Sequence, residues 1–338
     1  MPHHDTSAPT SHALRGDAGI AVPLLCGPMY PCSSPELVSA VSAAGGMGII
    51  QPLAFAHVHG CGLSEGLERI RAHTARPVGM NALVESSSRI YHRRMVRWVE
   101  EALEGGIRFF VTSLGKPGWV VERVRPSGGM VYHDVTERRW ALKALDAGVH
   151  GLIAVNRRAG GHAGATSAEE LLDELGDLGV PVVCAGGVAT PDEFAAALRL
   201  GYAGVQMGTR FIATLECRVS AAYKQALVDA GEDDIVLTER ITGVPLAVIG
   251  TPYVRRLGTR AGPLARWMLR GRRTKRLMRT LYALSAGRRL GSASLAETGA
   301  AELWQAGRSV AGIREVLPAG EIVRRCAAAA GVTPPDPG

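Results

Sequence analysis

Short apolar segments alternate with helical segments along the first two thirds of the chain, and this alternation limits the fold more than any other feature. Strands separated by helices indicate a parallel sheet, because parallel pairs need long crossover connections. Eight such units are the number that closes a (β/α)8 barrel. We therefore predict an α/β fold, a (β/α)8 TIM barrel, over residues 21–220. The eight strands are predicted at residues 21–29, 47–50, 78–83, 108–112, 129–134, 151–155, 181–185 and 204–207.

The glycine-rich turns separate this barrel from its main alternative, a doubly wound open sheet. An open sheet of that kind would bind a phosphate at the first turn, but residues 27–29 read Gly-Pro-Met and form no GxGxxG motif. Glycine turns that suit a phosphate follow strands seven and eight instead, at residues 186–187 and 208–209. Barrels carry their phosphate site at that place, so the barrel is the preferred interpretation.

The segment from residue 151 to residue 187 contains one complete βαβ unit. Ser167 and Glu170 have the spacing of a capping box and predict where its helix begins. In the glycine-rich turn before that helix, residues 159–164, His162 is the only ionisable side chain. A ligand can approach a histidine between glycines closely. We predict that His162 is catalytic, and a solvent-facing loop histidine is the alternative.

The composition is that of a globular protein. Hydrophobic residues make up 46% of the 338 residues, enough for a sizeable core. Residues 1–20 are polar and include Pro2 and Pro9, so we expect a disordered N-terminal segment. No secretory signal is apparent, and no apolar run reaches the roughly 18 residues of a membrane span. The six cysteines form no CxxC pair. We therefore predict a cytoplasmic protein with no metal site and no membrane partner.

The basic charge belongs to one segment. The net charge is +7, and twelve of the 38 lysines and arginines lie between Arg255 and Arg289, where no acidic residue occurs. We predict that residues 221–330 form a helical, basic cap packed on the barrel, and that residues 331–338 are a proline-rich tail. The basic segment is either a solvated helix face or a site for an acidic partner or an anionic ligand tail. No nucleic-acid motif accompanies it, so no nucleic-acid partner is predicted.

Several short motifs occur together in a fixed order. They are GPM at 27–29, SPEL at 34–37, AGGMG at 44–48, GMN at 79–81, AGGHAG at 159–164, CAGGV at 184–188, GVQMGTRF at 204–211 and WQAGRSV at 304–310. In these motifs the chain resembles the nitronate monooxygenase (2-nitropropane dioxygenase) family of FMN-dependent barrels. The resemblance extends from about residue 20 to about residue 325.

The resemblance implies an FMN site. The backbone of residues 27–29 would lie along the flavin ring, and Asn81 would hydrogen-bond to the flavin. The turns after strands seven and eight would hold the phosphate through backbone N–H groups and a hydroxyl. His162 would face the substrate as general base or oxyanion partner. The expected cofactor-binding residues are Gly27, Pro28, Met29, Asn81, His133, Gly161, Gly186, Gly187, Gln206, Gly208 and Thr209.

Some of these assignments have alternatives. Asn81 could cap a strand end, and Gln206 could be a buried polar residue bonded to the barrel. Many relatives carry a lysine in strand five, near the flavin's pyrimidine, which this chain lacks. His133 is our candidate to offset the negative charge of reduced flavin in its place. Arg158 stands where relatives often have glutamate, which could change the charge that the substrate prefers.

Three functions are compatible with this sequence. The expected one is the oxidation of small alkyl nitronates with O₂ to a carbonyl compound and nitrite. The second is an NAD(P)H-dependent enoyl-thioester (enoyl-ACP) reductase, whose acidic carrier would bind the basic segment. The third is a non-catalytic, flavin-binding interaction scaffold. We expect a monomer or a homodimer.

Overall fold

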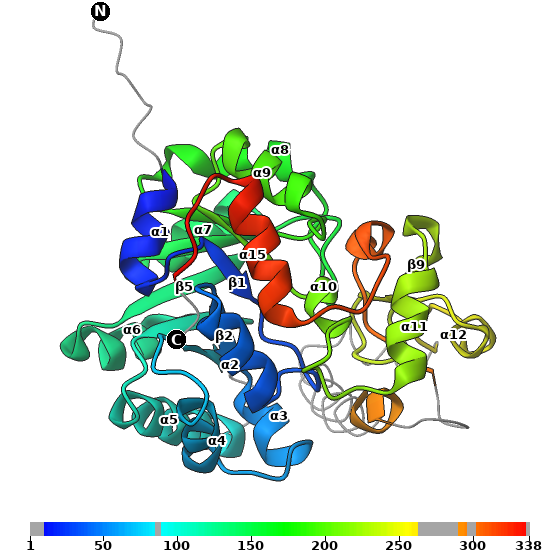
Figure 1. Ribbon diagram of the computed structural model, residues 1–338, viewed down its shortest axis with the longest axis horizontal. Helices are drawn as coiled ribbons and strands as arrows, with labels where there is room; N and C mark the ends of the chain where they lie inside the picture. Colours follow the sequence, from blue (N-terminus) through cyan, green and yellow to red (C-terminus); the bar gives the residue numbers. More distant parts are fainter. Residues whose placement is uncertain (1–9, 85–88, 263–289, 296–301, 336–338) are drawn as a thin grey trace, which may run out of the picture.

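The centre of the molecule is a closed barrel of eight parallel strands (Figure 1). It is seen in a computed structural model that describes residues 10–84, 89–262, 290–295 and 302–335. Each strand lies within its predicted segment or extends one residue beyond it, so the predicted fold is confirmed. The strands are β1 (Leu24–Cys26), β2 (Met47–Ile50), β3 (Gly79–Leu83), β4 (Phe109–Ser113), β5 (Met130–Val135), β6 (Gly151–Val155), β7 (Val182–Ala185) and β8 (Gly204–Met207).

Helices surround the barrel, and local sequence sets where several of them begin. Ser167 and Glu170 form the predicted capping box at α8. Ser34 caps α2 and Thr190 caps α9, each by accepting a hydrogen bond from the backbone N–H three residues later. The helices of the shell up to β8 are α2 (Pro35–Ala43), α3 (Pro52–His57), α4 (Leu63–Arg71), α5 (Arg89–Glu104), α6 (Gly118–Val124), α7 (Arg138–Asp146), α8 (Ala168–Leu175) and α9 (Pro191–Leu200), with 3₁₀ turns at Arg125–Ser127 and Gly176–Leu178.

Apolar side chains fill the barrel interior, which is therefore a packed core and no pore. They alternate along each strand with side chains that face the helices. The interior cluster includes Leu25, Met47, Ile49, Phe109, Val111, Tyr132, Ile153 and Val183. Beyond this layer, at the carboxyl ends of the strands, the next inward residues are smaller or polar.

Helix α1 (Thr10–Ala18) overturns the expectation of disorder for the second half of residues 1–20, and residues 1–9 lie outside the described residues. Its Leu14 is fully buried, and Leu14 and Ala18 belong to the cluster that fills the barrel interior. The hydroxyl of Tyr132, inside the barrel, donates a hydrogen bond to Asp17 Oδ2 at 2.8 Å. The few apolar residues of this polar segment thus close one end of the barrel, and that closure provides the burial that the helix needs.

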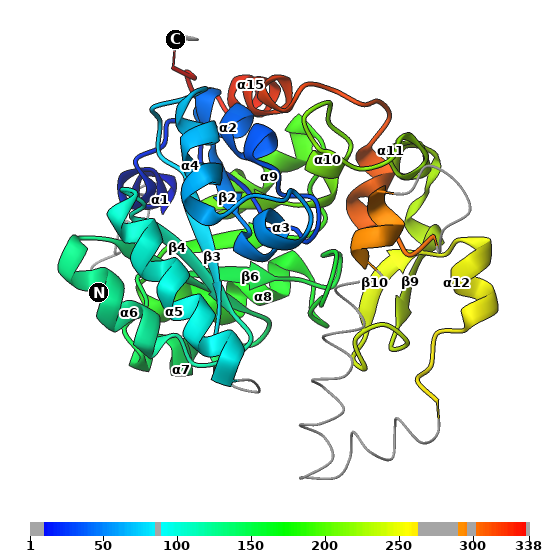
Figure 2. The same cartoon turned by 90° about the horizontal axis from the view of Figure 1, so that it is seen from below.

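The segment between β8 and the last helix is an insertion in the final βα unit. The short helix α10 (Thr209–Ile212) follows β8, and α15 (Ala319–Ala329) packs against α2 and α9. Helix α15 therefore takes the place of the eighth barrel helix (Figure 1). The described residues in between form a cap on one side of the barrel (Figure 2).

The cap differs from the helical cap that we predicted for residues 221–330. It contains α11 (Ala221–Asp229), α12 (Pro252–Leu257) and a two-stranded antiparallel sheet of β9 (Ile235–Thr238) and β10 (Leu246–Ile249). Residues 302–318 contain only the 3₁₀ helix η4 (Arg308–Gly312), and residues 319–329 belong to the barrel shell. Most of the basic segment, residues 263–289, lies outside the described residues. Within the described ranges, no helix is both long and apolar enough to cross a membrane.

Candidate active site

A cavity of about 830 Å³ opens at the carboxyl ends of the barrel strands. The residues predicted from the sequence come from different turns, yet the structure brings all of them to this one cavity. Those that line it are Gly27, Pro28, Met29, Asn81, His133, Gly161, His162, Gly186, Gly187, Gln206, Gly208 and Thr209. The cavity is therefore the candidate active site.

The cavity floor consists of the inward-facing residues at the strand ends. Each lies two residues beyond an inward position deeper in the barrel, and side chains on a strand alternate between its two faces. These residues are Gly27, Gln51, Asn81, Ser113, Asp134, Val155, Ala185 and Gln206.

Three side-chain oxygens on the cavity floor have no hydrogen-bond partner within the described part of the chain. They are Asn81 Oδ1, Asp134 Oδ1 and Gln206 Oε1, and all three are enclosed. An enclosed polar atom without a partner costs about 1–3 kcal/mol, so such atoms need an explanation. These oxygens point to a ligand that brings hydrogen-bond donors. The alternative for Gln206 was a hydrogen bond to the barrel, but its Oε1 makes no such bond within the described residues.

The turn after β7 requires glycine twice. Gly186 and Gly187 have φ angles of +111° and +80°, in the left-handed region. A Cβ at Gly186 would lie 2.6 Å from the backbone nitrogen of Ala159 and from Asn156 Oδ1. The turns after β6 and β7 are therefore in close backbone contact.

Asn156, which the sequence reasoning missed, holds these two turns together. Its Nδ2 donates to the carbonyl oxygen of Gly186 at 2.9 Å, and its Oδ1 accepts from the backbone N–H of Arg158 at 2.9 Å. Asn156 is 1% exposed. The sequence could have pointed to Asn156 by its position, because it is the polar residue directly after the apolar strand β6.

The turn after β8 presents a hydroxyl to the cavity. Thr209 Oγ1 accepts a hydrogen bond of 2.9 Å from the backbone N–H of Gly307, so its own hydrogen remains available to donate. A Cβ on Gly208 would meet Met29 Sδ at 3.5 Å, an ordinary contact. The turn therefore has room for a bound group and a donor aimed at it.

His162 lies at the exposed side of the cavity, on the β6–α8 turn. Its Nε2 is 3.3 Å from Thr242 Oγ1 of the cap. The turn is further tied to the cap because the backbone N–H of Ala247 donates to the carbonyl oxygen of Gly161 at 2.9 Å. The cap thus fixes the position of the imidazole, which can exchange a proton with a molecule in the cavity.

His133 is poorly placed for the role that we predicted. Its Nδ1 lies 2.8 Å from Thr112 Oγ1, and the residue is 5% exposed. Burial lowers the pKa of His133 to about 4, so the imidazole is neutral near pH 7. A neutral ring has no charge with which to offset a negative one.

Arg158 is engaged outside the cavity. Its Nη2 lies 3.3 Å from Glu232 Oε2, in the 3₁₀ helix Glu232–Asp234 of the cap, and Arg308 Nη1 lies 3.6 Å from the same carboxylate. Arg158 is not among the residues that line the cavity. The ion pair therefore holds the turn to the cap, and it gives no support to a role for Arg158 in substrate charge.

The cavity mouth is formed by Lys116, Trp140 and Lys143, none of which we predicted. Lys116 lies between β4 and α6, and the other two lie on α7. Lys143 Nζ is 4.5 Å from the centroid of the Trp140 ring, which is 42% exposed. Neither lysine forms an ion pair with any described carboxylate. The mouth is therefore cationic and carries a flat aromatic surface.

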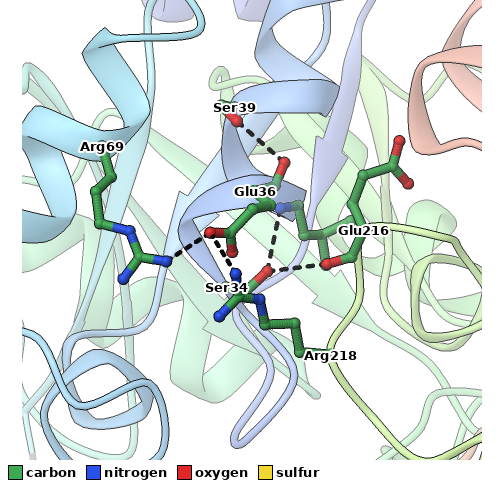
Figure 3. A network of polar contacts seen from close by, with 7 residues as sticks. Ser34, Glu36, Ser39, Arg69, Glu216 and Arg218 are labelled. Carbon is green, nitrogen blue, oxygen red and sulfur yellow. Dashed lines mark hydrogen bonds and ion pairs between the residues drawn. The ribbon is translucent and has the colours of Figure 1, made fainter.

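A polar network anchors the start of α2, the helix that follows the cavity-lining residues 27–30 (Figure 3). Glu36 Oε1, at the start of α2, lies 2.6 Å from Arg69 Nη2 and 3.0 Å from Arg218 Nη2. Ser34 Oγ donates to the carbonyl oxygen of Glu216 at 3.1 Å. Helix α2 is thereby fixed to α4 and to the segment after α10.

The family profile described as nitronate monooxygenase matches residues 11–326. The chain belongs to the nitronate monooxygenase family. Members of this family are flavin-dependent oxidoreductases, so this member is an oxidoreductase enzyme. The non-catalytic scaffold that we kept as an alternative is thereby set aside.

Two kinds of curated relative are found. The "(3aS,4S,5R,7aS)-5-hydroxy-7a-methyl-1-oxo-octahydro-1H-indene-4-carboxyl-CoA dehydrogenase" of Mycobacterium tuberculosis is 32% identical over 72% of this family member and 68% of the relative. A probable nitronate monooxygenase of Staphylococcus saprophyticus is 27% identical, over 73% and 81% of the two chains.

Solved structures resemble this family member along most of its length. FabK from Thermotoga maritima has a TM-score of 0.76 at 26% identity and covers 94% of this chain and 95% of its own. Nitroalkane oxidase from Streptomyces ansochromogenes has a TM-score of 0.72 at 25% identity, with coverages of 94% and 98%.

Proposed function

We propose that the protein is an FMN-dependent oxidoreductase that acts on an acyl thioester with an anionic carrier such as coenzyme A. The cofactor part of this proposal is supported by the unpartnered oxygens of the cavity floor. FMN carries a ring N–H and ribityl hydroxyls, which are the donors that Asn81 Oδ1 and Gln206 Oε1 lack. One phosphate-binding region and no dinucleotide motif favour FMN over FAD.

The residues that would hold FMN lie at two places on the cavity. Glycines without a Cβ and the Thr209 hydroxyl suit a phosphate at the turns after β7 and β8. The ring would be held by the 27–29 segment, Asn81 and Gln206. When bound, FMN supplies the acceptor or donor of an electron pair.

His162 would move the proton that accompanies this electron pair. It lies on the exposed side of the cavity, where substrate enters, and its ring position is fixed by Thr242 and by the cap. An imidazole is well suited to take a proton from carbon, or to return it, near neutral pH. His162 would therefore act at the substrate carbon next to the electron-withdrawing group.

The residues of the cavity mouth support the part of the proposal that concerns the substrate. Lys116 and Lys143 have no described carboxylate partner, so they offer positive charge to phosphate groups. Trp140 offers a flat, half-exposed ring on which an adenine could stack. The relative from M. tuberculosis, named as a CoA dehydrogenase, supports the same substrate class.

Oxidation of alkyl nitronates with O₂ is the second candidate, although it was first on sequence alone. The staphylococcal relative and nitroalkane oxidase of S. ansochromogenes support it. His162 would then bind the nitro group or take the α-proton of a neutral nitroalkane. A small nitronate, however, makes no use of the lysines and tryptophan at the mouth.

Reduction of the bound flavin under nitrogen tests both candidates. A saturated acyl-CoA, an enoyl-CoA with NADH or NADPH, and an alkyl nitronate are mixed in parallel with the FMN-loaded protein, and flavin absorbance is followed. We expect bleaching by an acyl-CoA, or NAD(P)H oxidation that depends on the enoyl-CoA, to be faster than bleaching by the nitronate. Fast reduction by the nitronate alone would reverse the order of the two candidates.

A further inference from the structure

Asp134 is the only carboxylate among the described residues that line the cavity, and the reaction outlined above does not use it. It lies two residues after Tyr132, which fills the barrel interior, so its side chain also points inward and forms part of the cavity floor. Its Oδ1 is enclosed and has no partner among the described residues. Burial raises the pKa of Asp134 to about 7. This carboxyl can therefore change its protonation state near neutral pH.

Among the described residues, no fixed positive charge lies close enough to Asp134 to hold it ionised. The strands β4 and β6 flank β5. Asp134 pairs with Ile153 of β6 and lies one residue beyond the pair His133 and Thr112, beside Ser113 of β4, and both neighbours are uncharged. Burial is the cause of the raised pKa of Asp134, with no charged group contributing to it. The other ionisable residues that line the cavity in the described chain are Tyr30, Cys32, Lys116, His133, Lys143, His162 and Tyr223.

Asp134 belongs to the cavity floor and not to the phosphate-binding turns. Those turns follow β7 and β8, whereas Asp134 is on β5, with β6 between, and Asn81 is on β3, across the closed barrel from β7. A cofactor with its phosphate at those turns and its ring against Asn81 would extend over this floor. Asp134 is the ionisable side chain among the floor residues named above.

We propose that Asp134 binds and releases a proton in step with the oxidation state of the bound flavin. This inference rests on the FMN site proposed above. Two electrons and one proton from the substrate leave the ring with one negative charge. In a low-dielectric site that charge raises the proton affinity of a nearby carboxylate. Asp134 then takes one further proton from hydronium in the solvent, so that one O–H bond breaks there and one forms on the carboxylate, and it returns this proton when the electrons leave for the oxidant.

The proton count is measurable as a slope of the reduction potential against pH. Each proton taken up by a two-electron couple changes the potential by about 30 mV per pH unit. Asp134 takes up a full proton only above its pKa of about 7 in the oxidised protein. Two protons, one on the ring and one on Asp134, therefore give about 60 mV per pH unit above pH 7, and the slope returns to about 30 mV well below pH 7.

The test is a spectroelectrochemical titration of three FMN-loaded proteins: the wild type, Asp134→Asn and Ser113→Ala. Ser113→Ala alters an uncharged neighbour on the same floor and serves as the matched control. Above pH 7, over about pH 8–9, we expect about 60 mV per pH unit for the wild type and for Ser113→Ala, and about 30 mV for Asp134→Asn. A wild-type slope of about 30 mV, or an unchanged slope in Asp134→Asn, overturns the proposal.

Infrared difference spectroscopy of the wild type keeps the test independent of that variant. Reduction should produce a carboxylic-acid C=O band that shifts when the solvent is D₂O. The absence of this band overturns the proposal even if Asp134→Asn fails to retain flavin. A wild-type protein that retains no FMN at all overturns the proposed cofactor site and this inference with it. A protein that binds FMN without the proton-coupled slope overturns only the role of Asp134.

Discussion

The floor and the mouth of the cavity differ in what they offer to a ligand. The floor presents enclosed acceptors, Asn81, Asp134 and Gln206, and their oxygens lack partners in the described chain. The mouth presents exposed cations, Lys116 and Lys143, which water can solvate. An unpartnered enclosed oxygen destabilises the empty protein, whereas an exposed lysine costs almost nothing. The floor therefore suits a cofactor that stays bound, and the mouth suits a substrate that comes and goes.

The largest expected effect is the loss of FMN on changing the turns after β7 and β8, where the phosphate would bind. In Gly208→Val the added side chain should occupy the space of the phosphate, since a Cβ there meets no protein atom nearer than Met29 Sδ at 3.5 Å. We expect complete loss of FMN retention, measured by the flavin released on heating, with little change in the melting temperature of the flavin-free protein. Gly187→Val is a weaker test because its φ of +80° would also strain the fold.

The matched control for Gly208→Val is Gly62→Val. A Cβ at Gly62 meets nothing within 4 Å, its φ is −68°, and it lies at the start of α4. We expect this variant to retain flavin as the wild type does. Equal flavin content in Gly208→Val and Gly62→Val would show that the phosphate lies elsewhere.

The second prediction distinguishes the role of His162 in proton transfer from the role of the floor in FMN binding. In His162→Asn, proton transfer at the substrate carbon is lost while a polar group remains in the turn. We expect the rate of flavin reduction by a substrate that must lose a proton to fall by about 10²–10⁴-fold, at unchanged FMN content. A preformed nitronate, which has already lost its proton, should be affected about tenfold at most. Equal losses on both substrates would mean that His162 only orients them.

The third prediction concerns how much the buried Asp134 of the floor lowers the free energy of unfolding. Because burial raises the pKa of Asp134 to about 7, above its unfolded value near 4, the folded flavin-free protein binds more protons than the unfolded chain between these values. Its stability should therefore fall as pH rises through this window and level off above pH 7. We expect Asp134→Asn to flatten this dependence and to stabilise the flavin-free protein at pH 8 by up to about 4 kcal/mol.

Urea unfolding of both flavin-free proteins at several pH values measures this effect. The same slope with pH in the wild type and in Asp134→Asn would show that Asp134 is not the group that titrates.

The smallest effect is expected at the mouth. Lys116→Ala and Lys143→Ala should each raise KM for a CoA thioester about tenfold, the effect of one charge-assisted hydrogen bond, and weaken its salt dependence. KM for a small nitronate should not change. Arg199→Ala, an exposed cation on α9 away from the cavity, is the control. A CoA thioester with unchanged KM in both lysine variants would remove the mouth from the substrate site.

The sequence allowed the barrel and the glycine turns of the cavity to be predicted because both depend on local patterns. Short apolar strands fix the eight-fold alternation, and glycines at strand ends mark where a backbone comes close to a ligand. His162 and the two glycine turns were therefore found to line one cavity, as expected.

What the sequence did not reveal depends on contacts between distant segments. Asn156 matters because it bonds a neighbouring turn, and Lys143 matters because α7 turns it toward the cavity. Asp134 was overlooked in favour of His133, its neighbour on the opposite face of the strand. The helix α1 was missed because its burial comes from the barrel end that it closes.

The position of α15 has a consequence for how the chain reaches its native state during synthesis. The last helix of the shell begins at residue 319, more than a hundred residues after β8 ends at residue 207. Ribosomes add about 5–20 residues per second, so the eight strands are complete on the order of ten seconds before the helix that covers α2 and α9 exists. During that interval the apolar surfaces of α2 and α9 stay exposed on the nascent chain. A chaperone that binds nascent chains would be expected to find its site there.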